Sequence, residues 1–311
     1  MRAYRSTLAG GISDTVKALA VSVIKDGNAI PIGSSCAHMF QGNTSIVDNV
    51  VIGKKVYGCQ YMFNGCTSFN QNIQTGNVVN NVAGMFKNCT NLDQNIYLSN
   101  NVEDCHETFY GCTKLNKKIG IPNSVQRCDN MFNGCTSLNQ YIEIPNSVYY
   151  CNNMFNGCSN LKIMPSIPAS AAYCNEMLVN TDVGRVSDFY IPNGIYTVTQ
   201  MLRNSSFNGN IYLPESVETC SGMLWDCQDF SGDVYIYRRS AVTTSGLFYN
   251  LVNAQKRKAV HIYGGDWYYT NAVLHGILPN VNNQWTQLPD NIYNGYYNSL
   301  YNIYVYTNLY S

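Results

Sequence analysis

A 23-residue period limits what this chain can fold into. A Met-Phe or Met-Leu pair, or its counterpart, recurs at equal steps from Met39 through Met62, Met85, Thr108, Met131 and Met154 to Met177. The pattern continues less regularly through Met201, Met223 and Leu247. A fixed period in the twenties is typical of repeat folds in which each unit supplies one strand and one turn. We therefore expect about ten units.

Physical chemistry requires such units to stack. One unit buries about six apolar side chains, each contributing roughly 1.5–3 kcal/mol, whereas ordering its backbone costs about 1–2 kcal/mol per residue. A single unit is therefore unstable, and stability comes from the contacts between neighbours. The sequence predicts a mainly β solenoid of about ten 23-residue units, with one parallel β face and terminal caps.

Short alternating segments are the expected strands of this face. In each segment an outward residue stands between two apolar ones, and proline often follows. They include Ile96-Tyr97-Leu98, Ile119-Gly120-Ile121, Ile142-Glu143-Ile144, Ile211-Tyr212-Leu213 and Val234-Tyr235-Ile236. Alternation indicates a strand with one buried face, and proline ends it because it has no N–H to donate. The Met-Phe segment is expected to form a single turn whose glycine, such as Gly134, needs unusual backbone angles.

The chain divides into three predicted regions. Residues 1–35 form an N-terminal cap, residues 36–250 the solenoid, and residues 251–311 a tyrosine-rich C-terminal cap or docking segment. Seven of the 18 residues from Tyr293 to Tyr310 are tyrosine, and aromatic enrichment is also typical of docking interfaces. The docking candidates are Tyr296, Tyr297, Tyr301, Tyr304 and Tyr306. The basic run Lys256-Arg257-Lys258 is expected to be a solvated turn.

Charge and hydropathy exclude some partners. The formal net charge is zero and only 12% of residues are charged, so a basic field for nucleic acid is absent. No apolar stretch approaches the roughly 20 residues of a membrane span. The N-terminal region fits the layout of a cleaved signal peptide poorly.

The 13 cysteines fall into two columns of the repeat. Seven precede the methionine position by three residues and six follow it by four; Val82 and Val198 replace the first kind, and Asn43, Thr181 and Ser205 the second. Small substitutes are typical of a packing position, so we expect buried, reduced thiols. Disulfides between successive units remain an alternative, although their separation fits the bond poorly. The Cys-x6-Cys interval does not match a zinc site, and we predict no metal or other cofactor.

Known catalytic motifs are missing from the sequence. There is no Gly-x-Ser-x-Gly elbow, phosphate-binding loop or His-Glu-x-x-His motif. A Cys105-His106 nucleophile pair is an alternative to a surface histidine beside a buried thiol. Two distant carboxylates could also meet on the outer face to hydrolyse a glycoside.

The segment from Gly134 to Val148 resembles the BspA-like, Treponema-type leucine-rich repeat, whose units read Cys-x-x-Leu, Ile-x-Ile-Pro-x-Ser-Val and then a small residue with Phe. The resemblance covers residues 36–240 and implies a leucine-rich-repeat solenoid. The Met-Phe pair is more similar to mycoplasma-type surface lipoprotein repeats, although their Trp-Asp-Thr-Ser-Asn segment is missing. The resemblance implies a non-enzymatic adhesion or recognition scaffold on microbial surfaces, and similar repeats occur in phages of gut bacteria.

If packing fixes the inward positions, the outward strand column selects the partner. This column reads Val51, Gln74, Tyr97, Gly120, Glu143, Ser166, Tyr190, Tyr212, Tyr235 and His261. Its aromatic members, flanked two residues earlier by Asp188, Asn210 and Asp233, suit sugar rings or protein side chains. A covering segment of the same chain is the alternative explanation.

We expect a non-catalytic recognition or attachment scaffold, most concretely a phage virion structural protein of the tail or receptor-binding type, made in the host cytoplasm. Expected partners are a host surface glycan or protein, other virion proteins, or a second copy of the chain. The alternatives are a bacterial cell-surface adhesin and, from another class, a polysaccharide-degrading enzyme with carboxylates on its outer face.

Overall fold

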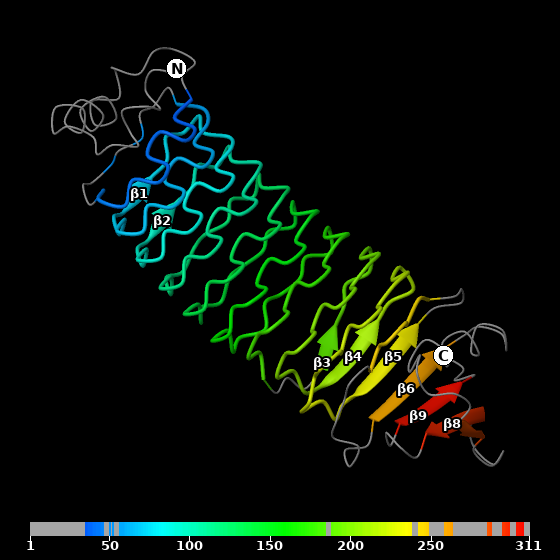
Figure 1. Ribbon diagram of the computed structural model, residues 1–311. Helices are drawn as coiled ribbons and strands as arrows, with labels where there is room; N and C mark the ends of the chain where they lie inside the picture. Colours follow the sequence, from blue (N-terminus) through cyan, green and yellow to red (C-terminus); the bar gives the residue numbers. More distant parts are fainter. Residues whose placement is uncertain are drawn as a thin grey trace, which may run out of the picture. The chain divides into compact units, whose positions relative to one another are not determined.

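The computed structural model describes residues 35–46, 50, 52, 56–184, 188–237, 242–248, 258–263, 285–287, 294–298 and 303–307. The chain divides into two compact units, unit 1 (Met1–Leu161) and unit 2 (Lys162–Ser311). Throughout the described ranges the regular elements are short β-strands joined by tight turns, without a helix (Figure 1). The predicted mainly β class with parallel strands is confirmed. The expected N-terminal cap lies almost wholly outside the described residues.

Unit 1 contains two named strands and a longer ladder of single bridges. Strands β1 (Ile73–Gln74) and β2 (Ile96–Tyr97) pair in parallel. Parallel bridges join the residues four positions before the methionine column in successive turns, which are Ser35, Gly58, Asn81, Asp104, Arg127 and Tyr150. The spacing of these residues is 23, so the sequence period is the stacking period of unit 1.

The Met-Phe turn forms a second ladder between neighbouring turns. Every second N–H of one turn donates to a carbonyl 22 residues later, as in Cys59 to Asn81 (2.9 Å), Tyr61 to Ala83 (2.8 Å), Phe63 to Met85 (2.8 Å) and Gly65 to Lys87 (2.7 Å). The N–H groups between them bond within the turn, for example Met62 to the Cys59 carbonyl at 3.2 Å. The N–H groups of this segment therefore bond alternately to the next turn and within their own turn, so the segment does more than form the single turn that the sequence suggested.

Two left-handed positions in each repeat shape this turn. The glycine column was predicted, and Gly134 has φ 74°. A second column, directly before the methionine, was missed because glycine occupies it only in some turns, as at Gly84 (φ 57°), and other turns hold residues such as Glu107 (φ 55°) and Asn130 (φ 55°). Left-handed backbone is uncommon for such residues, so the inter-turn hydrogen bonds hold it in place.

The core consists of aligned rows of equivalent side chains. Met62, Met85, Met131 and Met154 are all fully buried, which confirms that equal sequence positions occupy equal environments. Six phenylalanines of unit 1 stack from Phe40 to Phe155, with centroids 5.3–5.6 Å apart. All 13 cysteines are buried free thiols, as their packing interpretation predicted.

Two predicted strands of unit 1 are not regular strands. In residues 119–121 and 142–144, Ile119, Ile142 and Ile144 lie inward and are at most 5% exposed, whereas Ile121 is partly buried. Neither segment forms a ladder. Pro122 and Pro145 follow directly and lack an N–H, while the ladders on the other sides of the turn already hold neighbours together.

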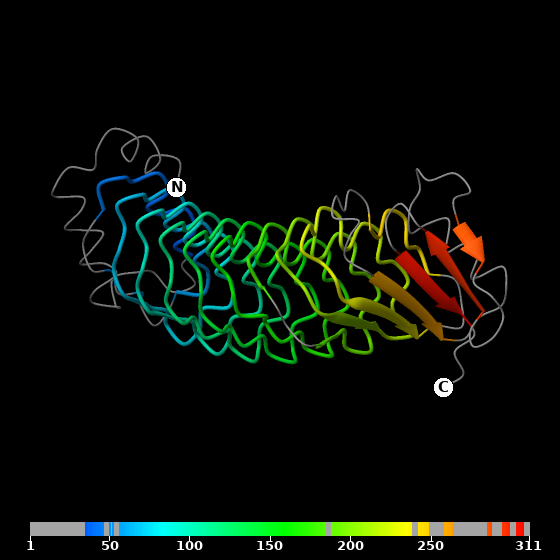
Figure 2. The same cartoon turned by 90° about the horizontal axis from the view of Figure 1, so that it is seen from below.

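Unit 2 contains a seven-stranded sheet of order β3-β4-β5-β6-β9-β8-β7 (Figures 1 and 2). Its strands are β3 (Asp188–Tyr190), β4 (Asn210–Leu213), β5 (Asp233–Tyr237), β6 (Lys258–Tyr263), β7 (Trp285–Gln287), β8 (Asn294–Asn298) and β9 (Ile303–Thr307). The first four and β9 run parallel, whereas β7, β8 and β9 pair antiparallel. The tyrosine-rich C-terminal segment therefore extends this sheet.

The predicted solvated turn at residues 256–258 is wrong at its last residue. Lys258 opens β6 and is 1% exposed, with its backbone in register with Ile303 of β9. The sequence analysis predicted that Lys258 is exposed to solvent because three cations in a row are typical of a solvated loop. The pairing of β6 with β9 begins the strand at Lys258, and the pairing with β5 follows at Ala259.

Candidate functional site

The outward strand position of unit 2 carries a continuous stack of aromatic rings, which we call the aromatic column. It contains Tyr190, Tyr212, Tyr235, His261 and Tyr306. Successive centroids lie 4.3, 4.6, 4.5 and 5.0 Å apart, with interplanar angles of 10°, 6°, 7° and 24°. The column forms because alternation turns these residues outward on strands paired in exact register.

Stacking determines which part of each ring a partner can touch. The faces of the inner rings contact their neighbours, so these rings present edges and polar atoms outward. Tyr190 stands at one end of the column and is 64% exposed. The inner rings therefore have no free face on which a sugar ring could pack, a consequence of ring orientation that the sequence spacing did not show.

A second aromatic pair lies beside the column. The rings of Tyr237 and Tyr263 stack at 4.5 Å and 13° on β5 and β6. Tyr237 is 39% exposed, and Tyr235 lies 6.5 Å from Tyr263. The exposed face of unit 2 is therefore broader than the single column that sequence indicated.

The predicted polar residues brace the aromatic column. The Asp188 Oδ1 atom accepts hydrogen bonds from Asn210 Nδ2 at 3.1 Å and from the Tyr212 hydroxyl at 3.3 Å. The Asp233 carboxylate accepts from the Ala259 N–H at 3.1 Å and lies 3.0 Å from His261 Nε2. These side chains hold neighbouring strands together and orient two members of the column.

The environment keeps the phenols neutral. Burial beside other rings raises the pKa of Tyr212 well above its ordinary value, and the negative charge of Asp188 adds to the effect. Burial and the charge of Asp233 likewise raise the pKa of Tyr235. Both hydroxyls therefore stay protonated at neutral pH and can donate hydrogen bonds.

The structure separates the predicted docking tyrosines. Tyr306 joins the aromatic column, and the ring centroid of Tyr304, also on β9, lies 6.2 Å from that of Tyr306. Tyr296 is partly buried and pairs in register with Val305, and the backbone of Tyr297 pairs with Tyr304. Tyr301 lies outside the described residues. The described part of the segment adds the last ring, Tyr306, to the column.

Tyr97 belongs to unit 1 and is not part of the aromatic column. It is 64% exposed on β2. The next residue in its column is Gly120, which supplies no ring.

The proposed Cys-His nucleophile is not assembled. The Cys105 thiol is fully buried, and its burial raises its pKa far above the ordinary value. His106 Nδ1 lies 2.7 Å from Asp104 Oδ1 instead. A catalytic cysteine needs its thiolate, so this pair lacks the required chemistry.

Two outer-face carboxylates are held ionised. Partial burial opposes ionisation of Asp104, but hydrogen bonds from His106 outweigh it and the pKa lies below the ordinary value. Burial also opposes ionisation of Glu107, and Lys87, 2.8 Å away, outweighs it and lowers the pKa. A general acid for glycoside hydrolysis needs a raised pKa, so neither carboxyl fits that role.

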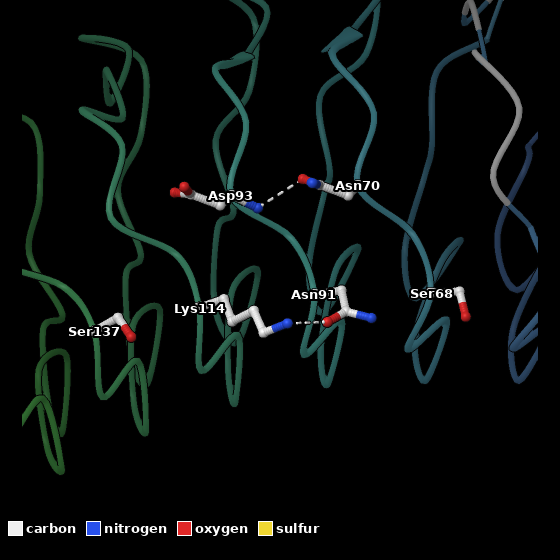
Figure 3. A pocket seen from close by; sticks show the side chains of 6 residues that line it. All are labelled: Ser68, Asn70, Asn91, Asp93, Lys114 and Ser137. Atoms are coloured by element: carbon white, nitrogen blue, oxygen red, sulfur yellow. Dashed lines mark hydrogen bonds between the residues drawn. The ribbon is translucent and has the colours of Figure 1, made fainter.

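An open polar hollow of about 570 Å³ lies on unit 1 (Figure 3). It is lined by Ser68, Asn70, Asn91, Asp93, Lys114 and Ser137. Its polar groups bond to each other: Asn70 Oδ1 accepts the Asp93 N–H at 2.9 Å, and Lys114 Nζ donates to Asn91 Oδ1 at 2.6 Å. Sequence reasoning did not single out these residues, and their contacts explain them as braces between turns.

Two further searches cover only the described part of the chain. No group of three His, Cys, Asp or Glu side chains there is arranged to hold a metal ion. Nor does that part contain a helix of the length and apolarity that crossing a membrane requires.

Parallel pairing at the repeat period, aligned buried rows and an outward aromatic column define a mainly β repeat protein. A family model described as "Mycoplasma protein of unknown function, DUF285" matches residues 34–144, 80–167 and 104–190, together about half of the chain. The chain belongs to this family. The overlapping matches begin at positions that differ by about one or two repeat periods.

A solved structure, a leucine-rich repeat protein from Bacteroides ovatus, is similar over 76% of this chain and 74% of that chain, with 17% identity and a TM-score of 0.38. No curated protein sequence matches.

Proposed function

We propose that this protein is a non-catalytic recognition scaffold: a leucine-rich-repeat solenoid of about ten units that binds a protein partner through the aromatic face of unit 2. The observation that carries the proposal is the aromatic column, with its exposed end at Tyr190. Because these rings point outward, they do not pack into the buried core of their own turns, so they are available to contact a partner. Tyrosine edges with neutral hydroxyls are typical of protein interfaces, where they combine apolar area with hydrogen bonds.

The proposed setting is a phage particle, in which the chain serves as a tail or receptor-binding component. All 13 cysteines are buried free thiols, and cysteines stay reduced in a cytosol. A virion protein folds in the host cytosol before assembly, whereas an exported adhesin folds in a more oxidising compartment. The thiols therefore favour the particle.

A bacterial surface adhesin is the second candidate. The description of the family names Mycoplasma, a bacterium. The two settings differ in where the protein resides, so location separates them.

Location is tested with an antibody against the purified chain. Phage particles and host cells are separated by density, and both fractions are examined by immunogold electron microscopy. The proposal expects label at one fixed site on the particle. Label on the surface of cells that release no particles supports the adhesin and contradicts the virion role.

Recognition is tested with variants that keep the stack. Tyr190→Phe and Tyr235→Phe remove hydroxyls but retain rings, so the fold should be unaffected. Labelled protein is titrated onto host cells, and the double variant should bind at least tenfold more weakly, about 1.4 kcal/mol. Tyr57→Phe, at an exposed tyrosine in unit 1, is the matched control.

Treating the cells before the titration identifies the class of partner. Protease should abolish binding, whereas periodate, which destroys glycans, should not. Equal binding by the double variant and the parent would contradict a role for the aromatic face.

A further inference from the structure

In unit 1 the outward column contains a gap one ring wide. Tyr97, Gly120 and Glu143 occupy the same position of successive turns. Hydrogen bonds between neighbouring turns support this register on both sides. Four residues earlier, equivalent residues are joined: the Asn116 N–H donates to Asp93 Oδ1 and the Asn139 N–H to Asn116 Oδ1, both at 2.9 Å. On the other side, Ser124 Oγ and Ser147 Oγ donate to carbonyls 22 residues earlier, those of Val102 at 2.6 Å and Val125 at 2.7 Å.

Gly120 makes the gap. A Cβ atom built on this residue would meet no atom within 4 Å, and the residue is exposed. The aromatic column of unit 2 shows that rings in this position stack 4.3–4.6 Å apart. A Tyr97 ring in the same orientation would have an uncovered face above Gly120, which agrees with its exposure of 64%.

The width of the gap suits a ring from a ligand. The three turns are joined by the parallel bridges Asn81–Asp104 and Asp104–Arg127. Bridged chains lie about 4.8 Å apart, so the backbone positions 97 and 143 should be about 9.6 Å apart. A ligand ring at van der Waals distance from Tyr97, about 3.5–4.0 Å, would lie over Gly120. Its far side would then be within reach of the Glu143 carboxylate.

The groups around the gap combine one aromatic face with polar side chains. Asn95, Lys118 and Tyr141 stand two residues before the three column members. A buried isoleucine, Ile96, Ile119 or Ile142, lies between the two in each turn, so both point away from the core. All three are exposed, as is Glu143. Among the described residues, Glu143 and Lys118 have no recorded hydrogen bond or ion pair, so both can bind a ligand.

This combination matches the chemistry of a pyranose. A sugar ring has an apolar C–H face that packs on an aromatic ring and hydroxyls around its rim that both donate and accept. Few polar groups are needed to orient a ligand that an aromatic side chain supports. An aromatic side chain of a partner protein would also stack on Tyr97, but it would leave the carboxylate and the ammonium without partners.

We propose that Tyr97, Gly120 and Glu143 form a slot that binds one neutral hexose residue of a glycan. Tyr97 packs on the sugar face, Gly120 leaves the space, and Glu143, Lys118 and Asn95 bond to hydroxyls. The slot belongs to unit 1 and does not depend on the proposed role of the aromatic column in unit 2.

The test is saturation-transfer NMR of the full chain with methyl β-glucoside, methyl β-galactoside and N-acetylglucosamine, each at about 10 mM because one residue should bind with a Kd of about 1 mM. Transfer to the C–H face of at least one sugar is expected. Tyr97→Ala should weaken binding at least tenfold. Tyr57→Ala, which removes an exposed tyrosine from another column, should leave it unchanged.

Gly120→Tyr is the decisive variant. Gly120 is not in the left-handed region and has open space around it, so a tyrosine there can stack on Tyr97 and fill the slot. The variant should remain folded by circular dichroism and lose sugar binding. Undiminished binding by folded Gly120→Tyr, or no transfer to any sugar of the panel, would overturn the proposal. Transfer to a tyrosine-containing peptide alone would assign the slot to a protein partner and overturn it equally.

Discussion

The buried thiols should make this protein unusually sensitive to alkali. Burial raises the pKa of 11 cysteine thiols, to about 11 for Cys36 and Cys227, to about 12 for Cys66 and Cys220, and further for the others. In the unfolded chain a thiol titrates near 8.5. The folded state therefore holds protons that the unfolded state releases between these values.

The sign and size of the effect follow from linkage. A group whose pKa is raised on folding stabilises the fold fully below its unfolded pKa, and the contribution is lost as the pH rises toward the folded value. One pH unit above 8.5, each thiol has lost about 1.4 kcal/mol. A turn with two thiols loses about 2.8 kcal/mol. The sum over 11 thiols, on the order of 15 kcal/mol, reaches the upper end of the roughly 5–15 kcal/mol stability of a typical domain.

Urea denaturation followed by circular dichroism tests this between pH 7.5 and 9.5, with a reductant and constant ionic strength. Tyrosines begin to ionise near the upper limit, so the control is Cys59→Val with Cys128→Val. Valine occupies the same column naturally at Val82 and Val198. The double variant should lose about 2.8 kcal/mol less than the parent at pH 9.5. Equal losses in the two proteins would refute the reasoning.

Three further outcomes follow from the packing, each measured by urea denaturation at pH 7. Cys135 Sγ donates to the Phe109 carbonyl at 3.1 Å, so Cys135→Ser should lower the free energy of unfolding less than Cys135→Val. At Cys128 the valine variant should be the more stable of the two, and at each site the variants should differ by about 1 kcal/mol. The same order at both sites would contradict the interpretation of the cysteines as two different columns. Phe109→Ala should cost about 3–5 kcal/mol because the ring is fully buried in the phenylalanine stack; a loss below 1 kcal/mol would show that the stack is not continuous. Gly134→Ala should cost about 1–2 kcal/mol because φ is 74°, while Gly120→Ala should change stability by less than about 0.5 kcal/mol; equal effects would remove the backbone explanation.

Sequence predicted burial far better than hydrogen bonding. The apolar period identified the methionine, phenylalanine and cysteine rows, since a side chain that must leave water recurs wherever the fold repeats. It did not predict the second left-handed column, because residues such as Glu107 and Asn130 carry no glycine signature. Backbone pairing leaves no trace in side-chain identity, so regular strands were expected at residues 119–121 and 142–144 where none form.

The aromatic column could be predicted as a row but not as a surface. Their shared place between two apolar residues of each repeat put Tyr190, Tyr212 and Tyr235 in line, and the structure confirms that alignment. Ring orientation depends on contacts with neighbouring rings, so the loss of free faces emerged only from the structure. The addition of Tyr306 was also hidden, because β9 reaches the sheet from outside the repeat period.

The outward strand position of the repeat can therefore present either stacked rings or an open space, without any change in the buried core. A ring at every turn closes the faces against each other and leaves edges, as at Tyr212 and Tyr235 in unit 2. A single glycine in that column, Gly120 in unit 1, leaves open space where a side chain would begin, and this space is the slot proposed beside Tyr97. Because the position is outward, either choice leaves the buried rows intact. Ligand class in this fold can thus change by exchange of glycine and tyrosine, and Gly120→Tyr tests this with one substitution.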